Sequence, residues 1–307
     1  MTRSTNSARG KILYFAIGGF ILLIIFSSIY FYHVQKQNQL DNNYINSNIP
    51  TMFVHGWGGG IDSETDMVTA VEKSGSATKR MVIHVTANGH IKVQGTIKKW
   101  MRNPIILLVF DNNRAGEDKY TQWLTKVNKL LKAKYNVNQI NFVGHSMGAY
   151  AVIYYNMLNG NNHKVPRVNK IIAMSGPYDG IIDNHKRNQP LTGPLARYWD
   201  DYPNQNQLLP NGRPKIIHPE YEQLLRVRYR MPKQARVINI YGNLENGSNS
   251  DGVVTNVSDK SLGYLIKDRV SFYTTVELTG PKAQHTQQHI DNLKVISVLK
   301  TFLWQVK

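Results

Sequence analysis

The chain alternates short apolar runs with longer segments in which apolar residues recur every three or four positions. Short apolar runs bounded by glycine or polar residues are typical of strands covered on both faces. The longer segments have the spacing of helices that bury one side. We predict strands at 51–56, 104–110, 139–143, 170–175, 236–242 and 271–280, and helices at 62–74, 117–135, 147–159 and 287–304. This alternation predicts an α/β fold with a mostly parallel sheet and helices on both faces.

Two segments interrupt this alternation. Residues 79–95 hold two alternating runs around Asn88-Gly89, which predicts a β-hairpin insertion. Residues 176–235 contain eight of the 12 prolines. A connection of this length in a compact domain usually has a function, so we expect a lid-like insertion or a binding surface. The alternative is a segment that only packs against one edge of the sheet.

The beginning of the chain has a different pattern. Residues 12–32 form an uncharged apolar run that would reach roughly 31 Å as a helix, enough to cross a bilayer core. Arg3, Arg9 and Lys11 precede it, so the positive-inside rule predicts a cytoplasmic N-terminus at 1–11 and an extracellular remainder. A cleaved signal peptide is the alternative, but its apolar core is usually about 7–15 residues long. We expect a single-pass protein of the cell membrane with a signal-anchor at 12–32.

The organisation of the rest follows from this assignment. Residues 33–49 are polar and rich in Asn and Gln, which predicts a short stalk. Residues 50–307 are enough for one large domain.

Composition limits the chemistry of the protein. There is no cysteine, which excludes disulfides, thiol catalysis and cysteine metal sites. The formal net charge of +17 favours anionic surroundings such as acidic lipid or anionic envelope polymers, or a generally basic surface without a specific partner. No dense basic run with interleaved aromatic residues is present, so we do not expect nucleic-acid binding.

The stretch GHSMG at 144–148 carries the strongest chemical signal. A strand, then G-x-S-x-G, then a helix is the context in which a serine is exposed as a nucleophile on a strained turn. The helix that follows directs free N–H groups and its dipole at developing negative charge. The alternative is a tight turn. We predict Ser146 as the nucleophile, and a structural role for His145 beside it.

A serine nucleophile needs a histidine base and a carboxylate, and in this architecture they follow it in the order acid, then histidine. His285 and His289 both follow the last predicted strand. We favour His285, because it lies in the loop, and keep His289, placed in the first turns of the last helix, as the alternative base. Asp251 follows the penultimate strand and is the favoured acid, and Asp179, after the strand before it, is the alternative.

The oxyanion formed during acyl transfer needs two backbone N–H donors. We predict Met147, directly after the serine, and Trp57 in the loop FVHGWGGG at 53–60. A phosphate-binding loop is the alternative for this glycine-rich segment, but the lysine of a P-loop is missing. The loop of Asp251 could also be a turn or a calcium loop, but it lacks calcium-loop spacing. We therefore expect no metal and no cofactor.

These motifs resemble the α/β-hydrolase superfamily and, within it, the cell-surface or membrane-anchored hydrolases of Gram-positive bacteria that are grouped as a domain of unknown function. The likeness runs from about residue 50 to the end and is carried by PTMFVHGWGGG, NPIILLVFDNN, NFVGHSMGAYA, INIYGNLENGSNSDGVVTNVSDKSLGYL and GPKAQHTQQH. It implies an α/β-hydrolase fold with Ser146 as nucleophile, Asp251 as acid and His285 as base. In relatives the second histidine often stands in a Leu-His-Glu context. Here it is QQHID, which argues against His289.

The expected function is that of a membrane-anchored extracytoplasmic serine hydrolase, similar to carboxylesterases and lipases. Its substrate would be a carboxylic ester, either a lipid ester or a small acyl ester, with amides and peptides less favoured. Two alternatives remain open. An acyltransferase would use the same three residues, and a non-catalytic envelope-binding protein would use only the scaffold and its basic surface.

Overall fold

The computed structural model describes residues 17–31, 43–182, 192, 196 and 199–306. The chain divides into one unit over Met1–Asp41 and a second over Asn42–Lys307. In the first unit, residues 17–31 form a helix, while the rest of the predicted signal-anchor, 12–16 and 32, lies outside the described residues. None of the helices that the structure describes is both long and apolar enough to cross a membrane.

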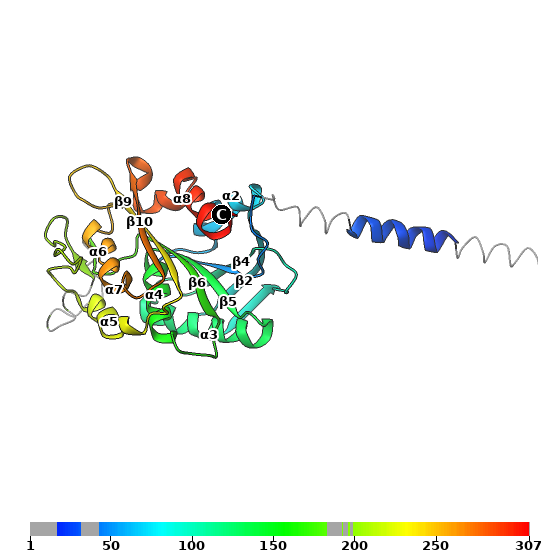
Figure 1. Cartoon of the computed structure of the whole chain (residues 1–307), viewed down its shortest axis with the longest axis horizontal. Helices are drawn as coiled ribbons and strands as arrows, with labels where there is room; N and C mark the ends of the chain where they lie inside the picture. Colours follow the sequence, from blue (N-terminus) through cyan, green and yellow to red (C-terminus); the bar gives the residue numbers. More distant parts are fainter. Residues whose placement is uncertain (1–16, 32–42, 183–191, 193–195, 197–198, 307) are drawn as a thin grey trace, which may run out of the picture. The chain divides into compact units, whose positions relative to one another are not determined.

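The second unit is built around an eight-stranded sheet in the order β10-β9-β6-β5-β1-β4-β2-β3 (Figure 1). The strands are β1 Thr51–Val54, β2 Thr78–Val85, β3 Ile91–Gly95, β4 Pro104–Phe110, β5 Gln139–His145, β6 Arg167–Met174, β9 Arg236–Asn243 and β10 Phe272–Thr279. Neighbouring strands pair in parallel except β3, which is antiparallel to β2. The mostly parallel sheet predicted from the apolar runs is confirmed.

Helices cover both faces of this sheet (Figure 1). On one face lie α2 Ile61–Lys73 and α8 Leu293–Leu299, and on the other lie α3 Glu117–Tyr135 and α4 Met147–Asn159. Strand β4 shows why the apolar run is continuous: Ile105 and Leu107 join the core under α2, while Ile106 and Leu108 join the core under α3 and α4. A strand buried on both sides needs apolar residues at every position.

The predicted β-hairpin is present as β2 and β3. Its turn is closed by a hydrogen bond from the Gly89 N–H to the Thr86 carbonyl at 2.7 Å. Gly89 has a φ of 77°, a left-handed conformation that glycine adopts without steric cost. This explains why the Asn-Gly pair marked the turn.

The chain enters the second unit before the residue expected to start the domain. Within the stretch 33–49, predicted as a stalk, the Ile45 N–H donates to the Trp304 carbonyl at 2.7 Å, and Asn103 Nδ2 donates to the Ile45 carbonyl at the same distance. Tyr44 forms an isolated antiparallel bridge with Gln305. The described residues from Tyr44 onward are therefore bound to the folded domain, while 33–42 lie outside the described residues.

The long insertion expected at 176–235 occupies the connection between β6 and β9. Its described elements are β7 Ile181–Ile182 paired in parallel with β8 Asp200–Asp201, then α5 Pro219–Val227 and η2 Arg228–Arg230. Two short helices, α6 Asn256–Lys260 and α7 Leu262–Ile266, connect β9 to β10. Residues 183–191, 193–195 and 197–198 of the insertion lie outside the described residues.

The single helix predicted at 287–304 is wrong in its extent. The segment instead forms η4 His285–His289, α8 Leu293–Leu299 and a π-helical turn, η5, Lys300–Trp304. Helix α8 begins where it does because Asn292 Oδ1 accepts a hydrogen bond from the Val295 N–H at 3.2 Å. Asp291, with a φ of 42°, breaks the helical path just before that cap.

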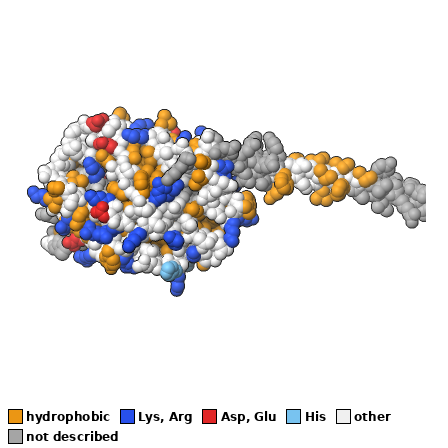
Figure 2. All heavy atoms as spheres, in the orientation of Figure 1, with side chains coloured by type: hydrophobic (Ala, Val, Ile, Leu, Met, Phe, Trp, Pro, Cys, Tyr) orange, Lys and Arg blue, Asp and Glu red, His pale blue; other side chains and the backbone are white. Residues whose placement is uncertain are grey.

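Lysine and arginine side chains are spread over the visible face of the domain rather than gathered in one stripe (Figure 2). This distribution agrees with the excess of 37 basic over 20 acidic residues in the sequence. A dispersed positive surface attracts anions in general without defining one binding site.

Candidate active site

Ser146 occupies a sharp turn between β5 and α4. Its φ of 55° and ψ of −126° form a conformation that costs energy in a residue other than glycine. Two glycines let the turn close: a Cβ on Gly148 would come within 2.2 Å of the Val54 carbonyl oxygen, and one on Gly144 within 2.8 Å of Ala149 Cα. The serine is thus held at the carboxyl end of a central strand, directly before the free N–H groups of a helix.

Asp251 and His285 form a buried hydrogen-bonded pair. His285 Nδ1 lies 2.7 Å from Asp251 Oδ2, and the His285 N–H donates to the Asp251 carbonyl at 3.0 Å. Asp251 follows β9 and His285 follows β10, so both lie at the same edge of the sheet as Ser146. Because a carboxylate can only accept, His285 carries its proton on Nδ1, and Nε2 is left as the basic nitrogen.

The carboxylate of Asp251 is held by further donors. Its Oδ1 accepts from the N–H groups of Val253 and Val254 at 2.9 and 2.7 Å, and Gln288 Nε2 lies 3.2 Å from Oδ2. Burial raises the pKa of Asp251, but the charge and hydrogen bond of His285 and the Val254 N–H outweigh it, so the pKa lies below its ordinary value. Asp251 is therefore ionised at neutral pH. Gln288 was not predicted from the sequence, in which only its position three residues after His285 connects it to the site.

His145 connects the turn of the serine to the histidine. Its Nε2 lies 3.0 Å from the His285 carbonyl oxygen, which can only accept, so His145 donates from Nε2. Burial, followed by the nearby charges of His285 and His289, lowers the pKa of His145 well below its ordinary value. The neutral His145 ring fixes the backbone of His285, in agreement with the structural role expected for it.

Among the residues that the structure describes, no hydrogen bond joins the Ser146 hydroxyl to the His285 ring. Such contacts are often long in enzymes without substrate and tighten when substrate binds. The His145 and His285 rings lie 4.7 Å apart, measured between centroids. His145 directly precedes Ser146 in the chain, so the His285 ring lies next to the residue before the serine.

His289 lies in the same short helix as His285, not in the last helix as predicted. Its ring is 4.8 Å from that of His145. Burial, then the charge of His285, lowers its pKa. The pair with Asp251 is made by His285, so the geometry favours His285 over His289 as the base.

The alternative acid, Asp179, is engaged elsewhere. Its Oδ1 accepts from the His218 N–H at 2.9 Å and lies 3.3 Å from His218 Nδ1, while its Oδ2 accepts from Asn206 Nδ2 at 2.9 Å. Burial raises the pKa of Asp179 to about 6. Burial lowers the pKa of His218, but the hydrogen bond and charge of Asp179 outweigh it and raise that pKa to about 9. Asp179 is therefore the partner of His218, and not of His285.

The loop of Trp57 touches the serine. A Cβ on Gly56 would lie 2.8 Å from Ser146 Cβ, so the backbone just before Trp57 borders Ser146. The loop is held by Asn113, whose carbonyl accepts from the Gly58 N–H at 2.7 Å. Trp57 itself is half exposed and follows Gly56, while Met147 is the first residue of α4 and follows Ser146 directly.

The buried ring of His55 holds the loop of Trp57 in place. Its Nε2 accepts from the Phe110 N–H at 3.0 Å, so the ring proton is on Nδ1 and donates to the Gly56 carbonyl at 2.8 Å. Burial lowers the pKa of His55, which keeps this ring neutral. The hydroxyl of Tyr120 adds a second donor to Gly56 at 3.3 Å.

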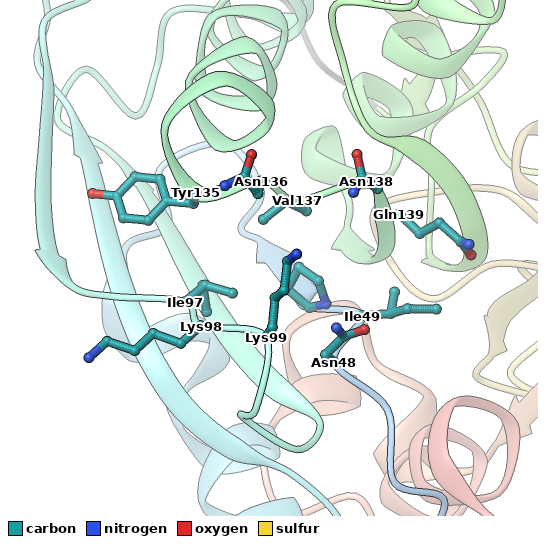
Figure 3. A pocket seen from close by; sticks show the side chains of 11 residues that line it. Asn48, Ile49, Ile97, Lys98, Lys99, Tyr135, Asn136, Val137, Asn138 and Gln139 are labelled. Atoms are coloured by element: carbon teal, nitrogen blue, oxygen red, sulfur yellow. The ribbon is translucent and has the colours of Figure 1, made fainter.

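A small cavity of about 110 Å³ lies at the opposite edge of the sheet (Figure 3). It is lined by residues 48–50, 97–99 and 135–139, and Gln139 is the first residue of β5, whereas Ser146 follows its last. Within the described part of the chain, no group of three or more His, Cys, Asp or Glu side chains could hold a metal ion.

The sheet order, the serine turn between β5 and α4, and the Asp–His pair after β9 and β10 define an α/β-hydrolase fold. Residues 38–306 match the family described as alpha/beta hydrolase of unknown function (DUF915). The chain belongs to this family.

The solved structures that share the fold include the following two. The product of lin2722 from Listeria innocua is 22% identical with a TM-score of 0.68, and the match covers 84% of this chain and 96% of that one. A protein of Lactobacillus plantarum WCFS1, described as a candidate cell surface hydrolase, is 21% identical with a TM-score of 0.62, and the match covers 83% and 89%. Among curated proteins no sequence matches the chain.

Proposed function

We propose that this protein is a serine hydrolase that cleaves carboxylic esters through an acyl-enzyme. The observation that carries the proposal is the 2.7 Å contact between His285 Nδ1 and Asp251 Oδ2, beside the strained turn of Ser146. This contact engages Nδ1 and leaves Nε2 as the nitrogen that can take a proton, which is the role that a general base requires.

In the proposed reaction, His285 Nε2 takes the proton of the Ser146 hydroxyl as its oxygen attacks the ester carbonyl. The N–H groups of Trp57 and Met147 stabilise the oxyanion. His285 then gives its proton to the departing alcohol, and an ester bond to Ser146 remains. Water, activated by the same ring, attacks this ester, releases the acid and restores the serine.

The cellular setting is part of the proposal. The charge pattern around residues 12–32 supports an uncleaved anchor with the hydrolase domain outside the cell, where lipid and small acyl esters are within reach. The basic surface supports contact with acidic lipids or anionic envelope polymers.

A fluorophosphonate probe tests the proposal on the full chain purified in detergent. Wild type should be labelled covalently, and Ser146→Ala should not. Ser297→Ala, which removes an exposed serine from α8, is the matched control and should keep its label. A folded wild-type protein that takes no label would refute the hydrolase and favour a non-catalytic binding protein. Product analysis with alcohols added as acceptors would separate hydrolysis from acyl transfer.

A further inference from the structure

A polar groove of about 550 Å³ lies beside the candidate active site. It is bordered by α6, by the ends of β9 and β10, and by residues 202–208 of the insertion, on the side of the domain where α6 is labelled in Figure 1. Asn249 and Thr255 line it and flank Asp251 along the chain. This volume is within the usual range for small-ligand sites, roughly 300–1,000 Å³. We call it the amide groove.

Side-chain amides dominate the lining of the amide groove. They come from the insertion, from β9 and from the segment that leads into α6: Asn204, Asn206, Gln207, Asn243, Asn249 and Asn256. An amide offers donors and an acceptor together, which matches a hydroxyl group that both donates and accepts. A row of amides is therefore suited to a ligand with many hydroxyl groups.

Several of these polar groups are free to bind. Within the described part of the chain, the side chains of Gln207 and Asn256 and the Tyr202 hydroxyl make no hydrogen bond, and Asn256 Oδ1 is buried without a partner. Tyr202 is 36% exposed and offers a ring face as well as its hydroxyl. Because Asn256 Oδ1 is buried, Asn256 would bind a ligand through its Nδ2 group.

The walls of the groove are held in place before any ligand arrives. Asn249 Nδ2 donates to Asn204 Oδ1 at 2.7 Å, and Asn204 Nδ2 donates to the Gly247 carbonyl at 2.9 Å. The Asn256 N–H donates to the Asn249 carbonyl at 2.8 Å. These bonds join the insertion to the loop of Asp251, so binding in the groove orders few additional side chains.

The charge of the groove differs from that of the whole molecule. The chain carries +17, but the charged side chains that line the groove are one lysine, Lys260, and one glutamate, Glu277. Lys260 Nζ lies over the ring of Tyr241, 5.2 Å from its centroid. The two charges balance, so the groove favours an uncharged ligand over the polyanions that the rest of the surface attracts.

We propose that the amide groove binds a neutral oligosaccharide. Gln207 and Asn256 bind its hydroxyl groups, and Tyr202 supplies an aromatic face against a sugar ring and a further hydroxyl. This proposal does not depend on catalysis by Ser146.

Saccharide binding can be measured by titration calorimetry on the full chain, held in a detergent without a sugar headgroup. The probes are tetra-N-acetylchitotetraose and cellotetraose, both uncharged. At least one of them should bind, and Tyr202→Ala, Gln207→Ala and Asn256→Ala should each weaken it by about tenfold, since 1.4 kcal/mol corresponds to a factor of ten. Ser146→Ala should bind like wild type, which separates this test from the test of the hydrolase.

Two matched variants control for the residue types. Tyr229→Ala removes a tyrosine that is 70% exposed outside the groove, and Asn161→Ala removes an exposed amide; both should bind like wild type. Thermal melting confirms that every variant is folded. The proposal is wrong if folded wild type binds neither tetrasaccharide, if the groove variants bind as tightly as wild type, or if sodium polyphosphate displaces the sugar from the groove.

Discussion

Replacing Asp251 by asparagine tests how the histidine is oriented. Oδ1 of the carboxylate accepts two backbone N–H groups, from Val253 and Val254, at 2.9 and 2.7 Å. Asparagine must keep its carbonyl oxygen there, because its NH₂ group cannot accept. The NH₂ group then takes the place of Oδ2, where it faces His285 Nδ1 and also Gln288 Nε2, which lies 3.2 Å from that oxygen.

A donor in this position changes which nitrogen of the His285 ring carries the proton. His285 has to accept at Nδ1 and carry its proton on Nε2, so it cannot take the proton of Ser146. The same change in a serine protease triad lowers kcat by about 10⁴-fold, and we expect a loss of this order for Asp251→Asn. It corresponds to about 5.5 kcal/mol of activation free energy.

The assay is the initial rate of p-nitrophenyl acetate hydrolysis together with the rate of fluorophosphonate labelling. Asp179→Asn is the matched control, since it makes the same exchange at another buried aspartate after a neighbouring strand. It should retain activity within about tenfold of wild type. The reasoning fails if Asp251→Asn keeps more than a tenth of the wild-type rate, or if Asp179→Asn loses more than Asp251→Asn does.

Three further predictions concern Gly56, Glu64 and His218. Gly56→Ala should lower kcat at least tenfold in the ester assay, because its Cβ would lie 2.8 Å from Ser146 Cβ. In the part of the chain that the structure describes, the Glu64 carboxyl is buried without a hydrogen-bond partner, and burial raises its pKa to about 8. The stability that depends on protonated Glu64 is therefore complete below about pH 4.5 and lost as the pH rises to about 8. Glu64→Gln should raise the unfolding free energy at pH 8 by several kcal/mol in denaturant titrations. Burial lowers the pKa of His218, but Asp179 outweighs it and raises this pKa to about 9. The stability that charged His218 contributes is therefore complete below about pH 6.5 and is lost as the pH rises through 9. In His218→Gln, the melting temperature should change less with pH between these two values.

Each of these predictions has its own comparison. Gly263→Ala should leave activity and folding intact, because its Cβ meets only ordinary contacts at 3.5 Å and beyond. A Gly56→Ala enzyme as active as Gly263→Ala would contradict the close approach to Ser146. For Glu64 and His218, a variant whose stability follows the same pH curve as wild type would show that the group does not titrate as described.

Most of the fold could be predicted from the sequence, because burial on both faces leaves a strong pattern. The run at 104–110 is buried at every position, and the helix at 117–135 matches its prediction residue for residue. The last helix could not be predicted correctly. Its apolar spacing continues through 287–304, but the φ of Asp291 and the cap at Asn292 divide it, and local backbone geometry of this kind leaves little trace in periodicity.

Only part of the candidate site could be predicted from the sequence, because some of its contacts join residues far apart in the chain. The turn of Ser146 is local in sequence and carries its own motif. The choice between Asp179 and Asp251 is not local, because both follow parallel strands that end at one edge of the sheet. The choice depends on which histidine packs against each carboxylate in the folded protein. The partner of Asp179 is His218, which comes from the insertion. The bond from His145 to the His285 carbonyl spans 140 residues and has no sequence signal at all.

Among the residues that the structure describes, Asp251 and Asp179 both follow neighbouring strands and each is buried against a histidine, but their surroundings differ. Asp251 accepts several donors and its pKa is lowered, despite burial, by His285. Asp179 is buried with a pKa of about 6, and it raises the pKa of His218 to about 9. A histidine that stays charged up to that pH cannot accept a proton from a serine at neutral pH. His218 is therefore unsuited to act as a base, and its pair with Asp179 ties the insertion to the end of β6. In the other pair, Asp251 engages only Nδ1 of His285, and Nε2 is the nitrogen that the proposed reaction uses.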